Sequence, residues 1–433
     1  MRQIRLLARV LRRLSAMAIL TTGLSTEGVA QGPDSTRADS AARARARADS
    51  AARADSLALV KELEKAAAGA RQPSAQGTGQ ANPRLLPDIS VVGDFVADLS
   101  RGGSTQENGR RIGVREVEAQ FVAAVDPYFR GEVLVAWSDA EGATLEQAIL
   151  TATALPWGLQ ARLGRIPLPF GKQNTLHREA LHTIEFPYAI QRFLAPEGLK
   201  ADGVVLSGIW SPFGFFQEVL LGVMDRFGEA PEDLLAEEPS NQTLEGLGYS
   251  ARLRNYWDLT QHANIELSAS VATGLREQPL DITTEINAVL ARQTLVGVDL
   301  TYRWRPLQQG LYRSLIVQAE YFRQYNESDP ALPAGVSPAQ YLGPRRAFDG
   351  AYLLGRYQLT RRTYIGTRGD LLEDPDQAGR TLRAVSGYLQ FLPSEFSKLV
   401  LGYERLMPRD ADHQGRLLLQ ATFAIGPHRP HPF

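Results

Sequence analysis

The sequence of 433 residues predicts an all-β fold, a 16-stranded antiparallel transmembrane β-barrel with a short N-terminal helical or low-complexity extension. Three observations predict it. Apolar and polar residues alternate from Leu85 onward, sixteen such runs can be marked, and short and long connections between the runs follow each other in turn. A period of two gives a strand one apolar and one polar face, and unequal connections at the two ends are typical of outer-membrane barrels.

The composition narrows the class of protein. Hydrophobic residues make up 44% of the chain and charged residues 22%, which excludes a wholly disordered chain. A formal net charge of −1 gives no reason to expect a nucleic-acid partner. The chain has no cysteine, which excludes a disulfide framework, thiolate ligation of zinc and a cysteine nucleophile.

The N-terminus has the pattern of a secretory signal peptide. Basic residues from Arg2 to Arg13 precede a short apolar run, and small residues lead to a cleavage point that we place after Ala30. An arginine-rich surface helix is the alternative for residues 1–30. No later stretch of about 18 apolar residues occurs, so we expect no helical membrane anchor in the mature chain.

A repetitive segment follows the signal peptide. Residues 38–44 (ADSAARA) recur at 48–54, within an Ala/Arg/Asp-rich segment, 31–70, that is predicted to be helical or coiled-coil-like and periplasmic. A disordered spacer is the alternative. Residues 71–84 have the Gly, Pro and Gln content of a linker. We expect the segment to tether the protein to peptidoglycan or another periplasmic partner.

Residues 85–433 form the predicted barrel. Val296, Val298 and Leu300 alternate with polar neighbours such as Asp299 and Thr301. The sixteen alternating runs span 88–99, 112–125, 128–138, 144–155, 158–166, 202–211, 214–225, 246–257, 261–273, 294–305, 312–325, 349–359, 362–372, 380–391, 396–406 and 415–426.

An even strand count places both ends of the barrel on the side of the short turns, and hence the extension in the periplasm. A large soluble all-β protein with its apolar face inward is the alternative. Aromatic residues near strand ends, such as Trp137, Trp210 and Trp304, favour a barrel in the outer-membrane lipid, because interfacial girdles need that placement.

The barrel segment resembles Gram-negative outer-membrane porins, in particular the phosphate-selective porin O/P family. The resemblance rests on GRIPLPFG at 164–171, on APEGLKADGVVLSG at 195–208, and on a final strand followed closely by a terminal aromatic, Phe433. It implies a water-filled diffusion channel for small hydrophilic solutes or ions, a homotrimer, and recognition of the C-terminal strand and Phe433 by the barrel-assembly machinery. It also implies that the third external loop, 167–201, folds into the pore as its constriction.

Two sets of charged residues are therefore candidates for the channel. The constriction candidates are the charged residues of the third loop: Lys172, His177, Arg178, Glu179, His182, Glu185, Arg192 and Lys200. The candidates for the pore-lining wall lie on the polar faces of the strands: Glu116, Glu118, Glu132, Arg162, Arg252, Arg254, Asp299, Arg303, Arg305, Glu320, Arg356, Arg383 and Arg416.

The charge balance leaves two interpretations of the wall open. A ladder of arginines would attract anions, since guanidinium pairs with phosphate through a fork of donors. Acidic residues share the same faces, however, and the barrel segment has 33 basic against 41 acidic residues, a net charge of −8. Mutual neutralisation along the wall is the simpler interpretation, and the charge gives no support to phosphate specificity.

The sequence offers little for a metal or an enzyme. His177 and His182 are five residues apart, which does not align them on one helical face, so we expect no metal site and no cofactor. Asp412 and His413 form the one acid–base pair considered for a barrel hydrolase. No GxSxG or HExxH motif occurs, and we expect a channel without catalysis; an outer-membrane hydrolase or a structural envelope tether is the alternative.

Overall fold

The computed structural model describes residues 87–106, 109–138, 142–225, 227, 244–279, 288–327, 347–375, 380–409 and 411–427. The predicted signal peptide, repetitive segment and linker lie outside these residues, as does Phe433. Within the described ranges, no helix combines the length and the apolar character needed to cross a membrane.

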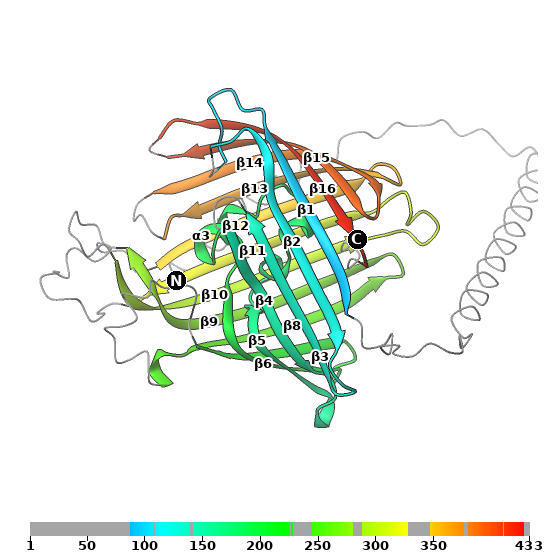
Figure 1. Ribbon diagram of the computed structural model, residues 1–433, viewed down its shortest axis with the longest axis vertical. Helices are drawn as coiled ribbons and strands as arrows, with labels where there is room; N and C mark the ends of the chain where they lie inside the picture. Colours follow the sequence, from blue (N-terminus) through cyan, green and yellow to red (C-terminus); the bar gives the residue numbers. More distant parts are fainter. Residues whose placement is uncertain are drawn as a thin grey trace, which may run out of the picture. The chain divides into compact units, whose positions relative to one another are not determined.

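Sixteen strands make up the described structure (Figure 1). They are β1 (Asp88–Asp98), β2 (Ile112–Ala124), β3 (Phe129–Ser138), β4 (Gly142–Ala152), β5 (Leu159–Pro167), β6 (Lys200–Trp210), β7 (Phe216–Met224), β8 (Gly248–Thr260), β9 (Ala263–Pro279), β10 (Ala288–Trp304), β11 (Leu315–Asn326), β12 (Ala347–Gln358), β13 (Thr363–Glu373), β14 (Thr381–Ser394), β15 (Ser397–Pro408) and β16 (Gln414–Ile425).

The strands close into a barrel. Each strand pairs antiparallel with its neighbours in the sequence, and β1 pairs with β16, with Val91 opposite Ile425 and Asp98 opposite Leu418. A closed sheet has no edge, so the backbone polar groups of every strand find partners within the sheet. The predicted 16-stranded antiparallel barrel is confirmed. The largest difference from the predicted bounds is the β9–β10 hairpin, which also includes 274–279 and 288–293.

The two faces of the sheet differ in polarity. In β14, Val385, Leu389 and Phe391 are 43–45% exposed and point outward, whereas the residues between them, among them Ser386 and Gln390, are buried inside. Apolar side chains therefore cover the outer surface, and polar ones gather inside.

The connections at the two ends of the barrel are unequal, as predicted. One end carries the connections 125–128, 153–158, 211–215, 261–262, 305–314, 359–362 and 395–396. The other end carries mostly longer ones, among them 99–111, 168–199, 225–247 and 327–346. We call these the turn side and the loop side.

Candidate functional site

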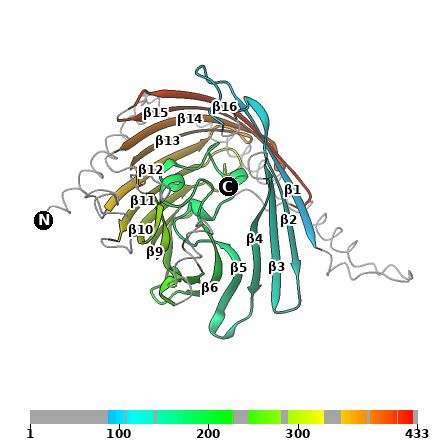
Figure 2. The same ribbon diagram turned by 60° about the vertical axis from the view of Figure 1, so that its left-hand side comes forward.

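The connection between β5 and β6, residues 168–199, lies inside the barrel, and we call it the inner loop (Figure 2). It contains two short 3₁₀ turns and α3 (Tyr188–Phe193). Its two ends are held together, because the Leu168 N–H donates to the Leu199 carbonyl over 2.8 Å. Asn174 completes this neck: its amide donates to the Leu168 carbonyl over 2.8 Å, and its oxygen accepts the Leu199 N–H over 2.6 Å.

Apolar contacts hold one side of the inner loop against the wall. Phe170 and Phe193 each stack on Phe322 of β11, with ring centroids 6.0 Å apart, and all three are fully buried. Glycines in the wall provide the space: a Cβ on Gly350 would lie 2.5 Å from the Phe193 ring, and one on Gly297 would lie 2.8 Å from the Phe170 ring. The wall is thus shaped for these aromatic rings, whose burial contributes strongly to packing.

Glu185 is the electrostatic centre of the inner loop. Its carboxylate lies 3.1 Å from Arg115 of β2, 3.1 Å from Arg178 of the loop and 3.6 Å from Arg416 of β16. Burial alone would raise the pKa of Glu185, but these guanidiniums hold that pKa below its usual value. The carboxylate therefore stays ionised and joins the loop to two strands that are neighbours of β1 on either side.

Arg178 extends this network of ion pairs toward the loop side of the barrel. It forms an ion pair with Glu197 and lies 3.9 Å from Glu116 of β2. Although burial opposes the charge, Glu185 and Glu197 raise the pKa of Arg178 above its usual value. The sequence predicted Arg178 and Glu185 for the constriction and Glu116 for the pore-lining wall, but it could not pair them.

The start of the inner loop is fixed to the opposite wall. The backbone N–H groups of Lys172 and Gln173 donate to the Glu320 carboxylate of β11 over 3.0 and 2.9 Å. The Lys172 ammonium donates to Glu266 of β9 over 2.7 Å. Burial lowers the pKa of Lys172, and Glu266 partly offsets this.

The middle of the loop reaches the strands between these points. Lys398 of β15 donates to the carbonyls of Glu179 and Leu181 over 2.5 and 3.2 Å. The Gln390 amide of β14 donates to the His182 carbonyl over 2.7 Å, and the His182 ring lies 3.2 Å from Arg356 of β12. The loop thus contacts both walls of the barrel.

Tyr188, the first residue of α3, makes a further link between the inner loop and the wall. Its hydroxyl donates to Glu404 of β15 over 2.8 Å, and its N–H donates to Asp370 of β13 over 2.9 Å. Burial and the neighbouring Glu404 raise the pKa of Tyr188. The protonated hydroxyl is the form that can donate this bond.

Two cavities lie beside the inner loop. The loop-side cavity has a volume of about 230 Å³ and is lined by Arg115, Arg178 and Glu185, with strand residues from the loop side of the barrel. The turn-side cavity has about 770 Å³ and is lined by Lys172 and Trp257, with residues from the turn side. The loop therefore contributes to the lining of cavities toward both ends of the barrel.

The structure places most of the predicted wall residues on the inner face. Some are paired there, such as Arg252 with Asp299 at 3.0 Å and Arg254 with Glu218 at 2.5 Å. The predicted wall residues that face inward are Glu116, Glu118, Glu132, Arg162, Arg252, Arg254, Asp299, Arg303, Glu320, Arg356 and Arg416.

Three predicted positions need correction. Arg383 is exposed on the outer face of β14 with Val385, because its position in the strand has the outward phase. Arg305 lies beyond the end of β10, in the turn, where it donates to the Gly310 carbonyl over 2.9 Å. Lys200 is the first residue of β6 rather than part of the loop, and forms an ion pair with Glu146 of β4.

One predicted loop residue stands apart from this network. Arg192 is exposed on α3. The sequence interpretation did not include Arg115, Tyr188, Asp370 or Lys398, which hold the loop. Strand alternation could have identified Lys398, which shares the inner face of β15 with Val400 and Glu404. Arg115 lies at an irregularity in the β1–β2 register, where alternation fails.

Comparison with known proteins supports the fold. No protein-family model matches the sequence. An uncharacterised protein of Aquifex aeolicus (strain VF5) is 27% identical over 393 residues, covering 81% of this chain and 80% of that protein. The outer-membrane protein OmpT of Vibrio cholerae, in a trimer form, has a TM-score of 0.53 at 10% identity and covers 78% of this chain and 99% of its own.

A second solved structure agrees. Salmonella typhi OmpF in complex with daunomycin has a TM-score of 0.51 at 9% identity and covers 78% of this chain and 97% of its own. At such low identity these similarities describe the fold alone. The barrel has the fold of outer-membrane porins.

Proposed function

We propose that the protein is an outer-membrane porin, a water-filled diffusion channel for small hydrophilic solutes or ions, in which the inner loop forms the constriction. The observation that carries this proposal is the position of residues 168–199, held inside a closed barrel by charged groups from both walls. A narrow point lined by mixed charges selects solutes by size and by its local field.

The rest of the barrel fits this role. Sixteen strands enclose more space than side chains of the wall alone fill. The outer face is apolar, as contact with lipid requires, and the inner face carries the charges. Cavities of about 230 and 770 Å³ beside the loop give solutes space toward both ends of the barrel.

The charges favour weak ion selectivity. Many inward arginines have carboxylate partners, such as Arg368 with Asp370 at 2.7 Å and Arg252 with Asp299 at 3.0 Å. The motifs at 164–171 and 195–208 still support kinship with the phosphate-selective porin O/P family. We do not extend this kinship to phosphate as the solute, because paired guanidiniums offer few donors to an anion.

The proposal includes transport without catalysis. Asp412 and His413, the acid–base pair of the hydrolase alternative, are exposed just before β16. A homotrimer is supported by the trimer form of the similar Vibrio cholerae barrel. The proposal also places residues 31–70 in the periplasm as a tether, and the C-terminal strand as the segment recognised by the assembly machinery.

Liposome swelling tests the constriction. The full chain and a variant with 176–196 replaced by a short Gly/Ser linker are each reconstituted with neutral sugars of increasing size. Asn174 and Gly198 stay in place, so the neck of the loop is retained. We expect the shortened variant to admit larger sugars and to swell faster with small ones.

A matched control replaces residues 307–311 of the turn-side connection 305–314 with a short Gly/Ser linker and should leave the size limit unchanged. Heat-modifiable migration on a gel establishes that both proteins are folded. Equal size limits for the full chain and the inner-loop variant would then show that the inner loop is not the constriction. Absence of swelling with every folded protein would refute the channel itself.

A further inference from the structure

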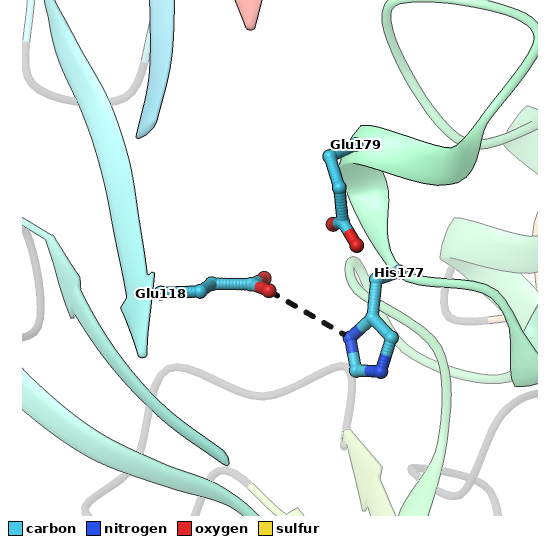
Figure 3. A group of neighbouring side chains, drawn as sticks. All are labelled: Glu118, His177 and Glu179. Carbon is cyan, nitrogen blue, oxygen red and sulfur yellow. Dashed lines mark ion pairs between the residues drawn. The ribbon is translucent and has the colours of Figure 1, made fainter. Parts of the chain in front are cut away.

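Three side chains converge at the point where the inner loop approaches β2 (Figure 3). Glu118 comes from β2, while His177 and Glu179 come from the loop beside and within its second 3₁₀ turn. One donor atom from each of the three lies within 4.8 Å of the others, and His177 Nδ1 is 4.0 Å from a Glu118 oxygen. His177 and His182 are five residues apart in the sequence, but the structure separates their rings, since His182 faces Arg356.

The second ring nitrogen of His177 also has a partner. Its Nε2 lies 2.8 Å from the side-chain amide nitrogen of Gln147, a buried residue of β4. With its amide turned so that the oxygen faces the ring, Gln147 accepts the Nε2–H, and the neutral imidazole then carries its lone pair on Nδ1, the nitrogen nearest Glu118. Histidine ligands of metals almost always have their second nitrogen engaged in this way, which fixes the ring and its tautomer.

The surroundings favour an incoming cation. A small cavity of about 10 Å³ adjoins Glu118 and His177, which is about the least space that can hold a single water molecule. Four carboxylates line it, Glu116, Glu118, Glu146 and Glu197, against two permanent cations, Arg178 and Lys200. Arg178 pairs with Glu197 and Lys200 pairs with Glu146, and the charge of Lys200 also acts on Glu118.

The donor set indicates the class of metal. One imidazole nitrogen with two carboxylate oxygens suits zinc and similar first-row divalent ions, whereas calcium and magnesium prefer oxygen ligands alone. We propose that Glu118, His177 and Glu179 form a three-ligand site for a divalent first-row transition ion, with water in the remaining positions. Because the ligands come from both the wall and the loop, a bound ion cross-links the inner loop to β2.

This cross-link has a consequence that rests on the proposed channel function. The small cavity shares Glu116, Arg178 and Glu197 with the loop-side cavity. An ion at this point narrows the passage along β2 and restrains the loop. Divalent transition ions should therefore lower the conductance of the channel.

Isothermal titration calorimetry of the full chain, folded in detergent, tests the binding with zinc chloride as the probe. We expect one zinc ion per chain, with magnesium failing to compete at equal concentration. E118Q, H177Q and E179Q should each weaken zinc binding by at least about tenfold, and Q147L by about tenfold through its effect on the ring. H413Q, a change at the exposed histidine of the β15–β16 connection, should leave binding unchanged.

Heat-modifiable migration establishes that each variant is folded, and Q147L and H177Q give two independent ways to weaken the site. Zinc binding that is absent from the folded wild-type chain, or equal in wild type and H177Q, would overturn the proposal. Planar-bilayer recordings with zinc test the consequence. Zinc binding without any block of conductance would support the metal site and would refute only its effect on the channel.

Discussion

At the scale of single residues, Glu185 carries the attachment of the inner loop. Its carboxylate is shared by Arg115, Arg178 and Arg416, which come from two strands and from the loop itself. Removing one member of a buried ion pair leaves the remaining charges without compensation, which typically costs about 3 kcal/mol or more. Glu185 therefore anchors the inner loop to β2 and β16 and balances the charge of the arginines beside the loop-side cavity.

E185Q should loosen the loop and leave three guanidiniums facing the passage. We expect larger and noisier single-channel conductance and a reversal potential shifted toward anion preference in a potassium chloride gradient. E197Q is the matched control, because Glu197 is 38% exposed and contacts only Arg178 of these three arginines. A reversal potential in E185Q equal to that of the wild type would contradict the role assigned to Glu185.

Glu185 also predicts a response to acid. Its pKa in the folded protein lies below the usual value of 4.5, so its contribution to stability is complete above about pH 4.5 and is lost as the pH falls through the folded-state pKa. The contribution of Glu185 to the conductance of the wild type should therefore change as the pH falls below 4.5. E185Q should lack this acid step, and an identical step in both proteins would assign it to another group.

Gly171 fixes the entry to the inner loop. Its φ of +65° is a conformation that glycine favours, and a Cβ there would lie 2.1 Å from the Glu320 oxygen that accepts the Lys172 N–H. G171A should displace this anchor and alter conductance. G158A separates the two effects, because Gly158 also has a positive φ, +71°, but has open space around its position. Equal changes of conductance in both variants would mean that the clash with Glu320 does not matter.

At the scale of elements, the strands were predictable and the packing of the inner loop was not. Alternation along a strand is a local signal, and it located all sixteen strands from the sequence alone. It does not extend past strand ends, where Arg305 leaves the sheet. For Arg383 it gives the same outer face as for Val385, so the predicted inward position of Arg383 did not follow the alternation. The contacts of Glu185 with the strands join residues 70 or more positions apart, such as Arg115, and no local pattern encodes such a pairing.

The α3 helix allows a direct test of the loop's position. Because the chain has no cysteine, R192C introduces a single thiol at an exposed position of α3. A positively charged thiol reagent should label R192C and lower its conductance by narrowing the passage. R305C, exposed in the turn after β10, should be labelled without loss of conductance. Complete labelling of R192C with unchanged conductance would place α3 away from the passage.

At the scale of the whole molecule, the barrel depends on closure between its first and last strands. Phe423 of β16 stacks on Phe95 of β1 with ring centroids 5.7 Å apart, and its ring occupies the place that a Cβ on Gly93 would take. The outer face at this seam is thereby covered by an aromatic side chain, and such aromatic pairs add about 0.5–1.5 kcal/mol beyond burial.

F423A should weaken closure. We expect a lower temperature for the loss of heat-modifiable migration than in the wild type, because the stacked pair across the seam is removed. F391A is the control, since Phe391 is similarly exposed to the outside, at 43%, but lies on β14, away from the seam. Equal losses in the two variants would show that the seam has no special role.

We propose that the apolar face of this barrel contacts lipid while its charged interior encloses a passage for water. Planar-bilayer recording of the detergent-folded full chain tests it most directly. We predict stepwise, ohmic conductance increments that grow when residues 176–196 are replaced by a short linker. A folded, heat-modifiable chain that inserts into the bilayer and produces no conductance, with or without its inner loop, would contradict the account.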